Sequence, residues 1–178
     1  GIITPGDYVR AGIVMYGVES LDRGHSRLEP VMTWRTRIAR LKELPAGHII
    51  GYGATFRTAR ESLIATLPVG YADGFDRLLS NNGEVLVRGV RAPVVGRVSM
   101  DLITIDVTDI PAVAAGDEVV LIGPQGGDRI TAEEMAARIG TIAYEVLCAV
   151  SARVPRLYIS KDKSVVRSKF AKVLNRSL

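Results

Sequence analysis

The sequence predicts a mainly β domain whose short antiparallel strands form a small closed, Greek-key-like barrel with one or two short helices. Three segments carry this prediction. Residues 84–88, 102–107 and 118–122 are short, rich in β-branched residues, and bounded by Gly, Pro and Asn. The chain has 178 residues, of which 47% are hydrophobic and 24% charged, so it is large enough to bury one core. Short strands joined by tight turns are typical of small barrels.

Strands are also expected in the first half of the chain. Residues 32–38 and 63–67 have the same composition, and the turn Leu44-Pro45-Ala46-Gly47 separates them. The opening run, residues 9–17, is mostly apolar with Arg10 near its start. This pattern predicts a buried strand with a polar residue at its edge.

Helix is predicted in two places. Thr131 and Glu134 form a capping box, Met135 and Ile139 follow on one apolar side, and Gly140 marks the end. In the tail, apolar residues recur at helical spacing and predict an amphipathic terminal helix with a solvated basic face: Val166, Phe170, Val173 and Leu174.

The formal net charge of +4 comes from the tail. Residues 161–178 hold six Lys or Arg against one Asp, a net +5, which leaves 17 basic and 18 acidic residues in the body. Because the body is nearly neutral and aromatics make up only 6%, we expect no nucleic-acid partner.

We expect neither a membrane span, nor a signal peptide, nor a metal site in this sequence. No apolar run of about 18 residues exists for a membrane span, and the first residues lack the basic start and apolar core of a signal peptide. His25 and His48 lack metal-ligand spacing, so no metal is expected. The lone Cys148 has no partner for an internal disulfide, which favours the reducing cytoplasm.

Three glycine-framed motifs are the most informative feature. They are Gly51-Tyr52-Gly53-Ala54-Thr55, Gly70-Tyr71-Ala72-Asp73-Gly74 and Gly96-Arg97-Val98-Ser99-Met100-Asp101. Glycine beside a tyrosine lets the backbone turn sharply and leaves the phenol uncovered. Either tyrosine motif alone is also typical of a surface turn. Together and in this order, the three motifs resemble the C-terminal half of the alanine racemase family, from about Val9 to Tyr158.

The resemblance implies a domain division and a function. Residues 1–28 match the last strand and linker of a pyridoxal-phosphate-binding (β/α)8 barrel, and residues 29–178 match the C-terminal β-domain. The family interconverts L- and D-alanine by two-base proton transfer and supplies D-alanine for peptidoglycan. Its head-to-tail homodimer shares each active site between two subunits.

Tyr52 matches the base that removes the α-proton of L-alanine, while a barrel lysine serves D-alanine. A free phenol has a pKa of about 10, so this role needs cations or hydrogen bonds that favour the phenolate. Met100 and Asp101 match residues on the substrate carboxylate side. Tyr71 matches a tyrosine that lines the inner entrance and restricts the pocket to small substrates.

Four other residues match contacts to the cofactor, pyridoxal 5'-phosphate. Arg10 matches the arginine that donates to the pyridine nitrogen and does not give up its proton. Gly12 and Ile13 match backbone donors to the phosphate, and Tyr144 matches a tyrosine that also contacts the phosphate.

The lysine that would bind the cofactor as a Schiff base is missing. The chain has five lysines, Lys42 in an expected turn and four in the tail, and none suits a desolvated, rigid site. We therefore expect the chain alone to be inactive. Two alternatives remain: a racemase for serine or a broader set of amino acids, and a non-catalytic β-barrel binding module that holds an anionic partner with its basic tail.

Overall fold

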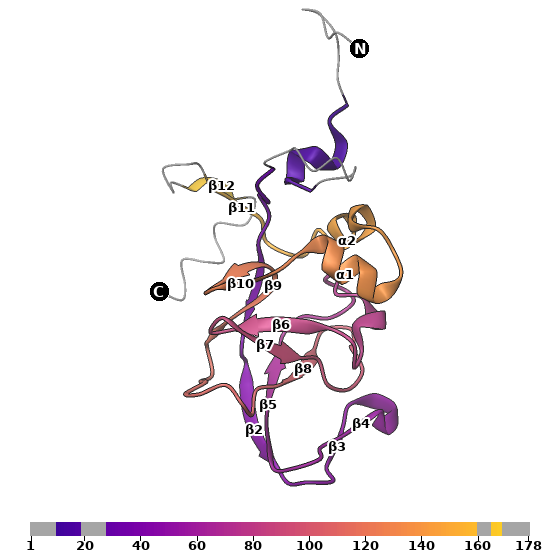
Figure 1. The fold of residues 1–178 in the computed structure, drawn as a ribbon, viewed down its shortest axis with the longest axis vertical. Coiled ribbons are helices and arrows are strands. Elements are labelled where there is room, and N and C mark those ends of the chain that lie inside the picture. The colour runs from indigo at the N-terminus through magenta and orange to yellow at the C-terminus, as the bar shows by residue number, and fades with distance from the viewer. Residues whose placement is uncertain (1–9, 19–27, 160–164, 169–178) are drawn as a thin grey trace, which may run out of the picture.

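The computed structural model describes residues 10–18, 28–159 and 165–168, which form strands, two α-helices and three 3-10 helices (Figure 1). The elements in chain order are η1 (Gly12–Tyr16), β1 (Trp34–Arg37), β2 (Arg40–Leu44), β3 (Ile49–Ile50), η2 (Tyr52–Ala54), β4 (Phe56–Arg57), β5 (Ser62–Leu67), η3 (Arg77–Leu79), β6 (Glu84–Val87), β7 (Val90–Pro93), β8 (Ile103–Asp106), β9 (Glu118–Gln125), β10 (Asp128–Ile130), α1 (Ala132–Ile139), α2 (Ala143–Ala149), β11 (Leu157–Ile159) and β12 (Val165–Ser168).

The main strands lie in two antiparallel sheets rather than one. The first has the order β1-β9-β6-β7 with β10 paired to β9, and the second has the order β2-β5-β8. The chain passes between them across Ile38 and Ala39, whose N–H groups bond to Asp117 and Thr66 respectively. Two short pairs, β3 with β4 and β11 with β12, complete the strands.

The predicted closed barrel is wrong, because closure requires a continuous ladder of hydrogen bonds between all neighbouring strands. Between β7 and β8 that ladder is reduced to one bridge, Val94 with Ile105. The chain turns away directly afterwards at Gly96, whose φ is 82°. The same turn carries the chain toward the loops that hold the candidate site.

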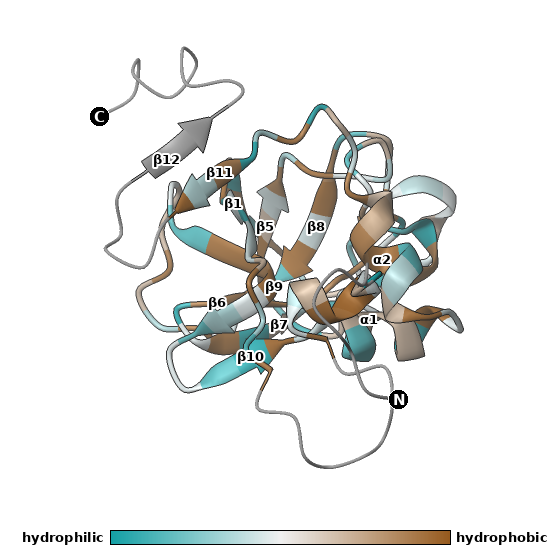
Figure 2. Cartoon of the chain, turned by 90° about the horizontal axis from the view of Figure 1, so that it is seen from above, coloured by the Kyte–Doolittle hydropathy of each residue, from teal (hydrophilic) through white to brown (hydrophobic). Residues whose placement is uncertain are grey.

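The core lies between the two sheets and beneath the helices. Leu67, Val85 and Val119 are fully buried, and hydrophobic residues run along the central strands in Figure 2. Trp34 meets Phe75 edge to face, with ring centroids 6.2 Å apart. Each such side chain contributes about 1.5–3 kcal/mol on burial, so the core fixes the sheets that support the surface loops.

Five of the predicted strands are confirmed with shifted ends, those at residues 32–38, 63–67, 84–88, 102–107 and 118–122. The largest shift is in β9, which continues to Gln125 instead of ending before Gly123-Pro124. Pro124 is tolerated there because that end of β9 pairs only with β10, where Pro124 lies opposite Arg129. The turn is Gly126-Gly127. The turn predicted at 44–47 is present, and Gly47 donates its N–H to Thr58 O at 2.8 Å.

The first predicted helix is confirmed as α1. Thr131 Oγ1 accepts the N–H of Glu134 at 3.1 Å, and Gly140 ends the helix in the left-handed region with φ 74°. The tail helix is wrong where the structure describes it, because residues 165–168 form strand β12 against β11. The β-branched pair Val165-Val166 favours a strand. Phe170, Val173 and Leu174 lie outside the described residues.

The opening segment is not the predicted strand. Val9 lies outside the described residues, and Gly12–Tyr16 form the 3-10 helix η1, closed by Gly17 with φ 74°. No described strand pairs with this segment, and an unpaired strand is not stable in water. Ile13 and Val18 are buried, and Val31 donates its N–H to Tyr16 O at 3.2 Å, so η1 is attached to the domain.

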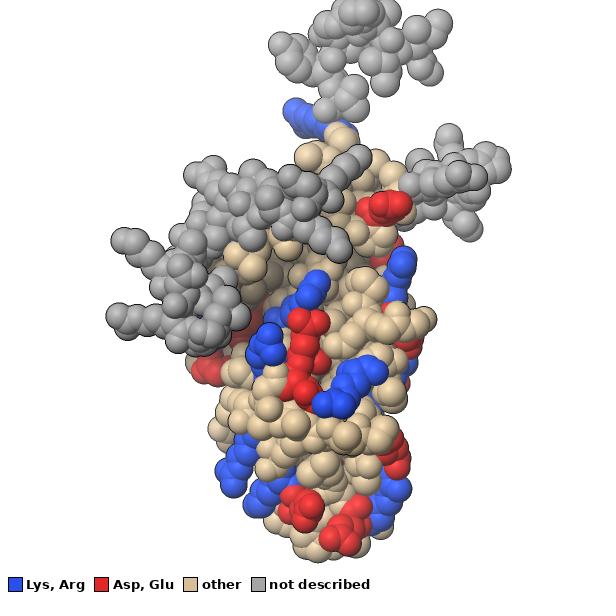
Figure 3. Space-filling model, turned by 90° about the vertical axis from the view of Figure 1, so that its left-hand side faces the viewer, with Lys and Arg blue, Asp and Glu red and all other residues tan. Residues whose placement is uncertain are grey.

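Arg91 of β7 lies at the centre of a charge network that fastens α1 to the first sheet. Its guanidinium contacts Glu84 at 3.0 Å, Asp128 at 2.7 Å and Glu134 at 2.5 Å, and Arg138 bonds to the same two glutamates. The hydrogen bonds from Arg91 lower the pKa of Asp128 and of Glu134 below their ordinary values. Figure 3 shows one face, where acidic and basic side chains lie side by side instead of forming a patch of one sign.

Arg91→Met should destabilise the domain and make its free energy of unfolding depend less on pH. A carboxylate with a lowered pKa in the folded state stabilises the protein above its unfolded pKa, and this contribution disappears as the pH falls through the folded value. We expect the free energy of unfolding at pH 7 to fall by about 1 kcal/mol, and less further loss toward pH 3 than in the unsubstituted chain. Urea unfolding at both pH values measures this.

Arg35→Met is the matched control, because it removes only an exposed pair with Glu118 at 3.2 Å. We expect a change below about 0.5 kcal/mol for it. Equal losses for the two variants would show that the Arg91 network contributes nothing beyond an ordinary surface pair.

Candidate active site

The three glycine-framed motifs meet on one side of the domain, with residues 96–101 in the middle. The backbone N–H groups of Tyr71 and Ala72 donate to the carbonyls of Ser99 and Met100, both at 3.0 Å. On the other side, a Cβ added at Gly51 would lie 3.1 Å from the backbone nitrogen of Arg97. Segments that are up to 50 residues apart therefore form one surface.

The turn that carries Tyr52 depends on left-handed backbone. Gly51 and Gly53 have φ of 74° and 72°, and Ala54 has φ 52°. The turn lifts the tyrosine off the surface, so that Tyr52 is 74% exposed. Among the described residues, no group hydrogen bonds to its phenolic oxygen. Such a phenol is available to a ligand.

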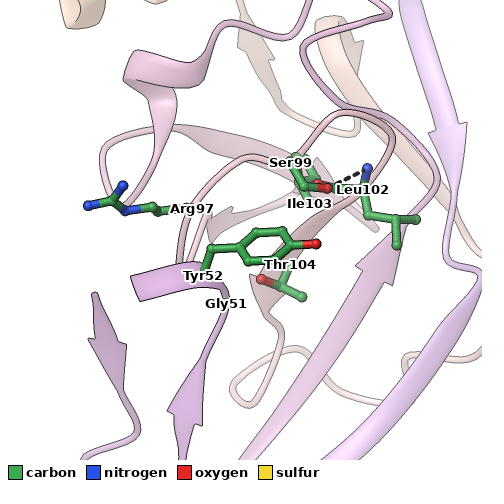
Figure 4. A pocket seen from close by; sticks show the side chains of 7 residues that line it. All are labelled: Gly51, Tyr52, Arg97, Ser99, Leu102, Ile103 and Thr104. Carbon is green, nitrogen blue, oxygen red and sulfur yellow. Dashed lines mark hydrogen bonds between the residues drawn. The ribbon is translucent and has the colours of Figure 1, made fainter. Parts of the chain in front are cut away.

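Tyr52 forms one wall of an open pocket of about 290 Å³ (Figure 4). The phenol points toward Ser99 and Leu102, and the Arg97 guanidinium points the other way. Ser99 Oγ accepts the N–H of Leu102 at 3.1 Å and so closes the turn opposite the phenol. The pocket is lined by Gly51, Tyr52, Arg97, Ser99, Leu102, Ile103 and Thr104.

The Tyr71 turn (residues 70–74) packs closely against residues 96–101, which form the central loop of the site. A Cβ on Gly70 would lie 2.3 Å from the carbonyl oxygen of Ser99, so only glycine fits. Asp73 accepts the N–H of Gly70 at 2.9 Å and so stabilises the turn. Phe75 is fully buried and anchors the turn, while Tyr71 is 45% exposed at the surface.

Met100 and Asp101 project from the tight turn closed by Ser99. Met100 is 53% exposed, so its side chain is not a core residue. Asp101 pairs with Arg153 at 2.5 Å, and Arg153 also pairs with Asp73 at 2.9 Å. The hydrogen bond to Asp101 is the largest cause that raises the pKa of Arg153, and the charge of Asp73 raises it further. Arg153 thus ties the central loop to the Tyr71 turn, a role that the sequence did not predict.

The four expected cofactor residues lie elsewhere. Arg10 and Gly12 are exposed at η1, Ile13 is buried, and Tyr144 is half-exposed on α2. Figure 1 shows η1, in indigo, at the end of the molecule opposite β3 and β4, which flank Tyr52. The structure therefore divides the candidate residues into a substrate group around Tyr52 and a cofactor group near η1 and α2.

The backbone at Gly12 leaves room for a phosphate, but the described residues do not suit covalent attachment of the cofactor. A Cβ added at Gly12 would meet nothing within 4 Å, so a ligand can approach this backbone closely. The only lysine among the described residues is Lys42, which lies exposed on β2 opposite Ile64 and not in the expected turn. An exposed strand lysine lacks the desolvation that a Schiff-base lysine needs.

Metal-binding clusters and membrane-spanning helices are both absent from the described part of the chain. No group of three His, Cys, Asp or Glu side chains there is placed to hold a metal ion. None of the helices described is long and apolar enough to cross a membrane.

Comparison with known proteins gives a consistent result. The family profile described as alanine racemase, C-terminal domain, matches residues 31–158. The alanine racemase of Halothermothrix orenii is 57% identical over 157 residues, which are 87% of this chain and 41% of that protein. The alanine racemase of Desulfosudis oleivorans is 48% identical over 164 residues, 90% of this chain and 42% of that protein.

Solved structures agree in fold. The alanine racemase from Bacillus anthracis with bound L-Ala-P is 42% identical with a TM-score of 0.81, covering 88% of this chain and 40% of that one. The enzyme from Bartonella henselae with covalently bound pyridoxal phosphate is 36% identical with a TM-score of 0.76, covering 83% and 40%. The chain spans about two fifths of these relatives' length. It belongs to the alanine racemase family and carries that family's C-terminal domain.

Proposed function

We propose that this chain is the C-terminal part of a pyridoxal-phosphate-dependent alanine racemase, in which Tyr52 removes the α-proton of L-alanine in the active site of a neighbouring subunit. The observation that carries the proposal is the exposed Tyr52 phenol at the wall of an open pocket, with no hydrogen-bond partner among the described residues. A tyrosine needed only for packing would be buried or bonded.

A head-to-tail homodimer accounts for the separation of the two residue groups. Alanine is so small that the base and the cofactor must meet at one carbon atom. Tyr52 and the η1 group lie toward opposite ends of one chain, so one copy cannot bring them together. Two copies can do so if the Tyr52 surface of one faces the cofactor group of the other.

Each of the candidate residues of this chain would then have a separate role in the reaction. Bound pyridoxal phosphate supplies an electron-withdrawing ring that makes the α-proton of alanine removable. Tyr52 accepts that proton at its phenolic oxygen. Arg10 donates to the ring nitrogen without giving up a proton, and Tyr71 with Met100 narrows the approach to small side chains. The assembled enzyme provides D-alanine for peptidoglycan. It does so in the cytoplasm, where the exposed thiol of Cys148 stays reduced.

The chain by itself is expected to be inactive. With added pyridoxal phosphate and L-alanine, the 178-residue chain should give no racemisation above buffer, because no described lysine suits covalent attachment. Chiral chromatography measures the D-alanine formed, and mass spectrometry after borohydride reduction measures labelling of lysines. Stoichiometric labelling of one lysine together with D-alanine formation would contradict this expectation.

A chimera tests the function itself. This chain would replace the matching 157 residues of the Halothermothrix orenii alanine racemase, to which it is 57% identical. We expect racemisation of alanine within about tenfold of the parent enzyme. A preference for serine would favour the broader racemase, and a folded dimer without any racemisation would favour a binding module.

A further inference from the structure

We propose that Asn81 is a positioning residue for Tyr52: its side-chain amide joins Thr55, at the end of the tyrosine turn (residues 51–54), to Gly96, whose backbone packs against the start of that turn. This inference rests on the proposed role of Tyr52. Asn81 follows η3 and lies outside the three glycine-framed motifs, 29 positions after Tyr52. Neither its residue type nor its place in an Asn-Asn-Gly turn marks it as part of the site.

The amide of Asn81 joins two of the site loops. Its oxygen Oδ1 accepts the backbone N–H of Gly96 at 2.6 Å. Its nitrogen Nδ2 donates to Thr55 Oγ1 at 3.1 Å. Asn81 itself has φ 54°, a conformation that asparagine tolerates better than most residues, and this backbone aims its side chain between the loops.

One contact is at the end of the tyrosine turn, and the other is with a glycine that packs against its start. Thr55 directly follows the turn. Gly96 lies against the segment before it, since a Cβ on Gly96 would be 3.1 Å from the carbonyl oxygen of Ile50. The hydroxyl of Ser80 adds a parallel contact and accepts the N–H of Val98 at 3.0 Å. The position of Tyr52 relative to the central loop therefore depends on residues 80 and 81.

The turn needs such support because its own backbone is unfavourable. Gly51, Gly53 and Ala54 all have positive φ, and the alanine conformation is one that L-residues rarely adopt. The exposed phenol makes no bond of its own to a described residue. A shift of about 1 Å in a catalytic group can cost about 100-fold in rate, so loss of the Asn81 contacts should show in catalysis before it shows in folding.

Asn81→Gly in the chimera is the sharpest test, because glycine accepts φ 54° without strain and only the amide is lost. We expect kcat to fall about 10- to 100-fold and KM to change less than about threefold. Asn81→Asp keeps an acceptor for Gly96 and should retain more activity. Asn82→Ala is the matched control, since the Asn82 amide bonds to Arg138 O at 2.7 Å and not to the site loops.

Two further readouts separate positioning from general loosening of the fold. Deuterium at the α-carbon should slow turnover of L-alanine more in Asn81→Gly than in the parent chimera, and turnover of D-alanine should not gain such sensitivity. In the 178-residue chain, amide hydrogen exchange at Gly96 should quicken at least about tenfold in Asn81→Gly and stay unchanged in Asn82→Ala.

The outcomes can be told apart. If Tyr52→Phe inactivates the chimera while Asn81→Gly leaves kcat and the Gly96 exchange rate unchanged, the positioning role is overturned and the proposed function stands. If kcat falls equally in Asn81→Gly and Asn82→Ala, the effect is general and the positioning role is again overturned. If Tyr52→Phe has no effect, the proposed function itself fails.

Discussion

Replacing Tyr52 by phenylalanine in the chimera is expected to abolish exchange of the α-proton of L-alanine. Phenylalanine keeps the ring that walls the pocket and removes only the phenolic oxygen, so packing around Gly51 and Thr104 should be retained. General base catalysis typically contributes about 10²- to 10⁴-fold to a rate. We expect kcat/KM for racemisation to fall by a factor in that range.

Proton exchange measures the base more directly than racemisation. The equilibrium constant between the two enantiomers is fixed, so kcat/KM must fall equally in both directions. In D2O, NMR can instead follow exchange of each α-proton without inversion. D-alanine should still exchange with retention through the base on the opposite face, while L-alanine should not. The assignment of Tyr52 fails if L-alanine exchanges at the parental rate.

Tyr158→Phe is the matched control for this experiment. Tyr158 lies on β11 and is 51% exposed, so it also loses an exposed phenolic oxygen, but it does not line the Tyr52 pocket. Its exchange rates should equal those of the parent. An equal loss in both variants would point to a general effect on the fold.

A helix could be predicted from the sequence where a capping residue and a stop residue mark its two ends. Helix α1 has a side-chain cap at Thr131 and a left-handed stop at Gly140, and both are visible in the residue types. Helix α2 begins at Ala143, its N-cap residue Ile142 provides no side-chain cap, and it has only seven residues, so nothing in the sequence marks it. Its existence depends on packing against α1, which no window of sequence contains.

Closure of the sheets shows the same limit. Strand composition predicted the strands but not how their edges meet, because the end of pairing between β7 and β8 is set by the turn at Gly96. Glycine at that position is visible in the sequence. Its close approach to Ile50, which explains why the chain turns there, is a contact across 46 positions.

The candidate site was predictable where its residues lie in contiguous sequence motifs. The glycines around Tyr52 and Tyr71 indicated uncovered tyrosines, and both are exposed at the surface. Arg153 and Asn81 escaped prediction because their contacts cross long stretches of chain: Arg153 reaches Asp101 over 52 positions, and Asn81 reaches Thr55 over 26. Arginine and asparagine are common surface residues, so only the fold reveals what they hold.

Gly70→Ala is expected to destabilise the 178-residue chain by about 3 kcal/mol, at the upper end for overpacking. The added Cβ would lie 2.3 Å from Ser99 O and 2.4 Å from Met100 O. Both obstacles are backbone atoms that also accept the N–H groups of Tyr71 and Ala72, so relief of the clash would break those hydrogen bonds. For a chain of this size we expect a melting temperature lower by about 6–12 °C.

Gly127→Ala is the control, because a Cβ there meets nothing within 4 Å. Neither Gly70 nor Gly127 has a left-handed φ, so backbone strain cannot explain a difference in melting temperature between the two variants. Such a difference would come from the close approach of the Tyr71 turn to the central loop. Thermal unfolding of both variants would therefore test whether the second and third motifs meet as described, independently of any catalytic role. Equal melting temperatures would mean that the two loops do not touch, and Tyr71 and Met100 could not then shape one pocket.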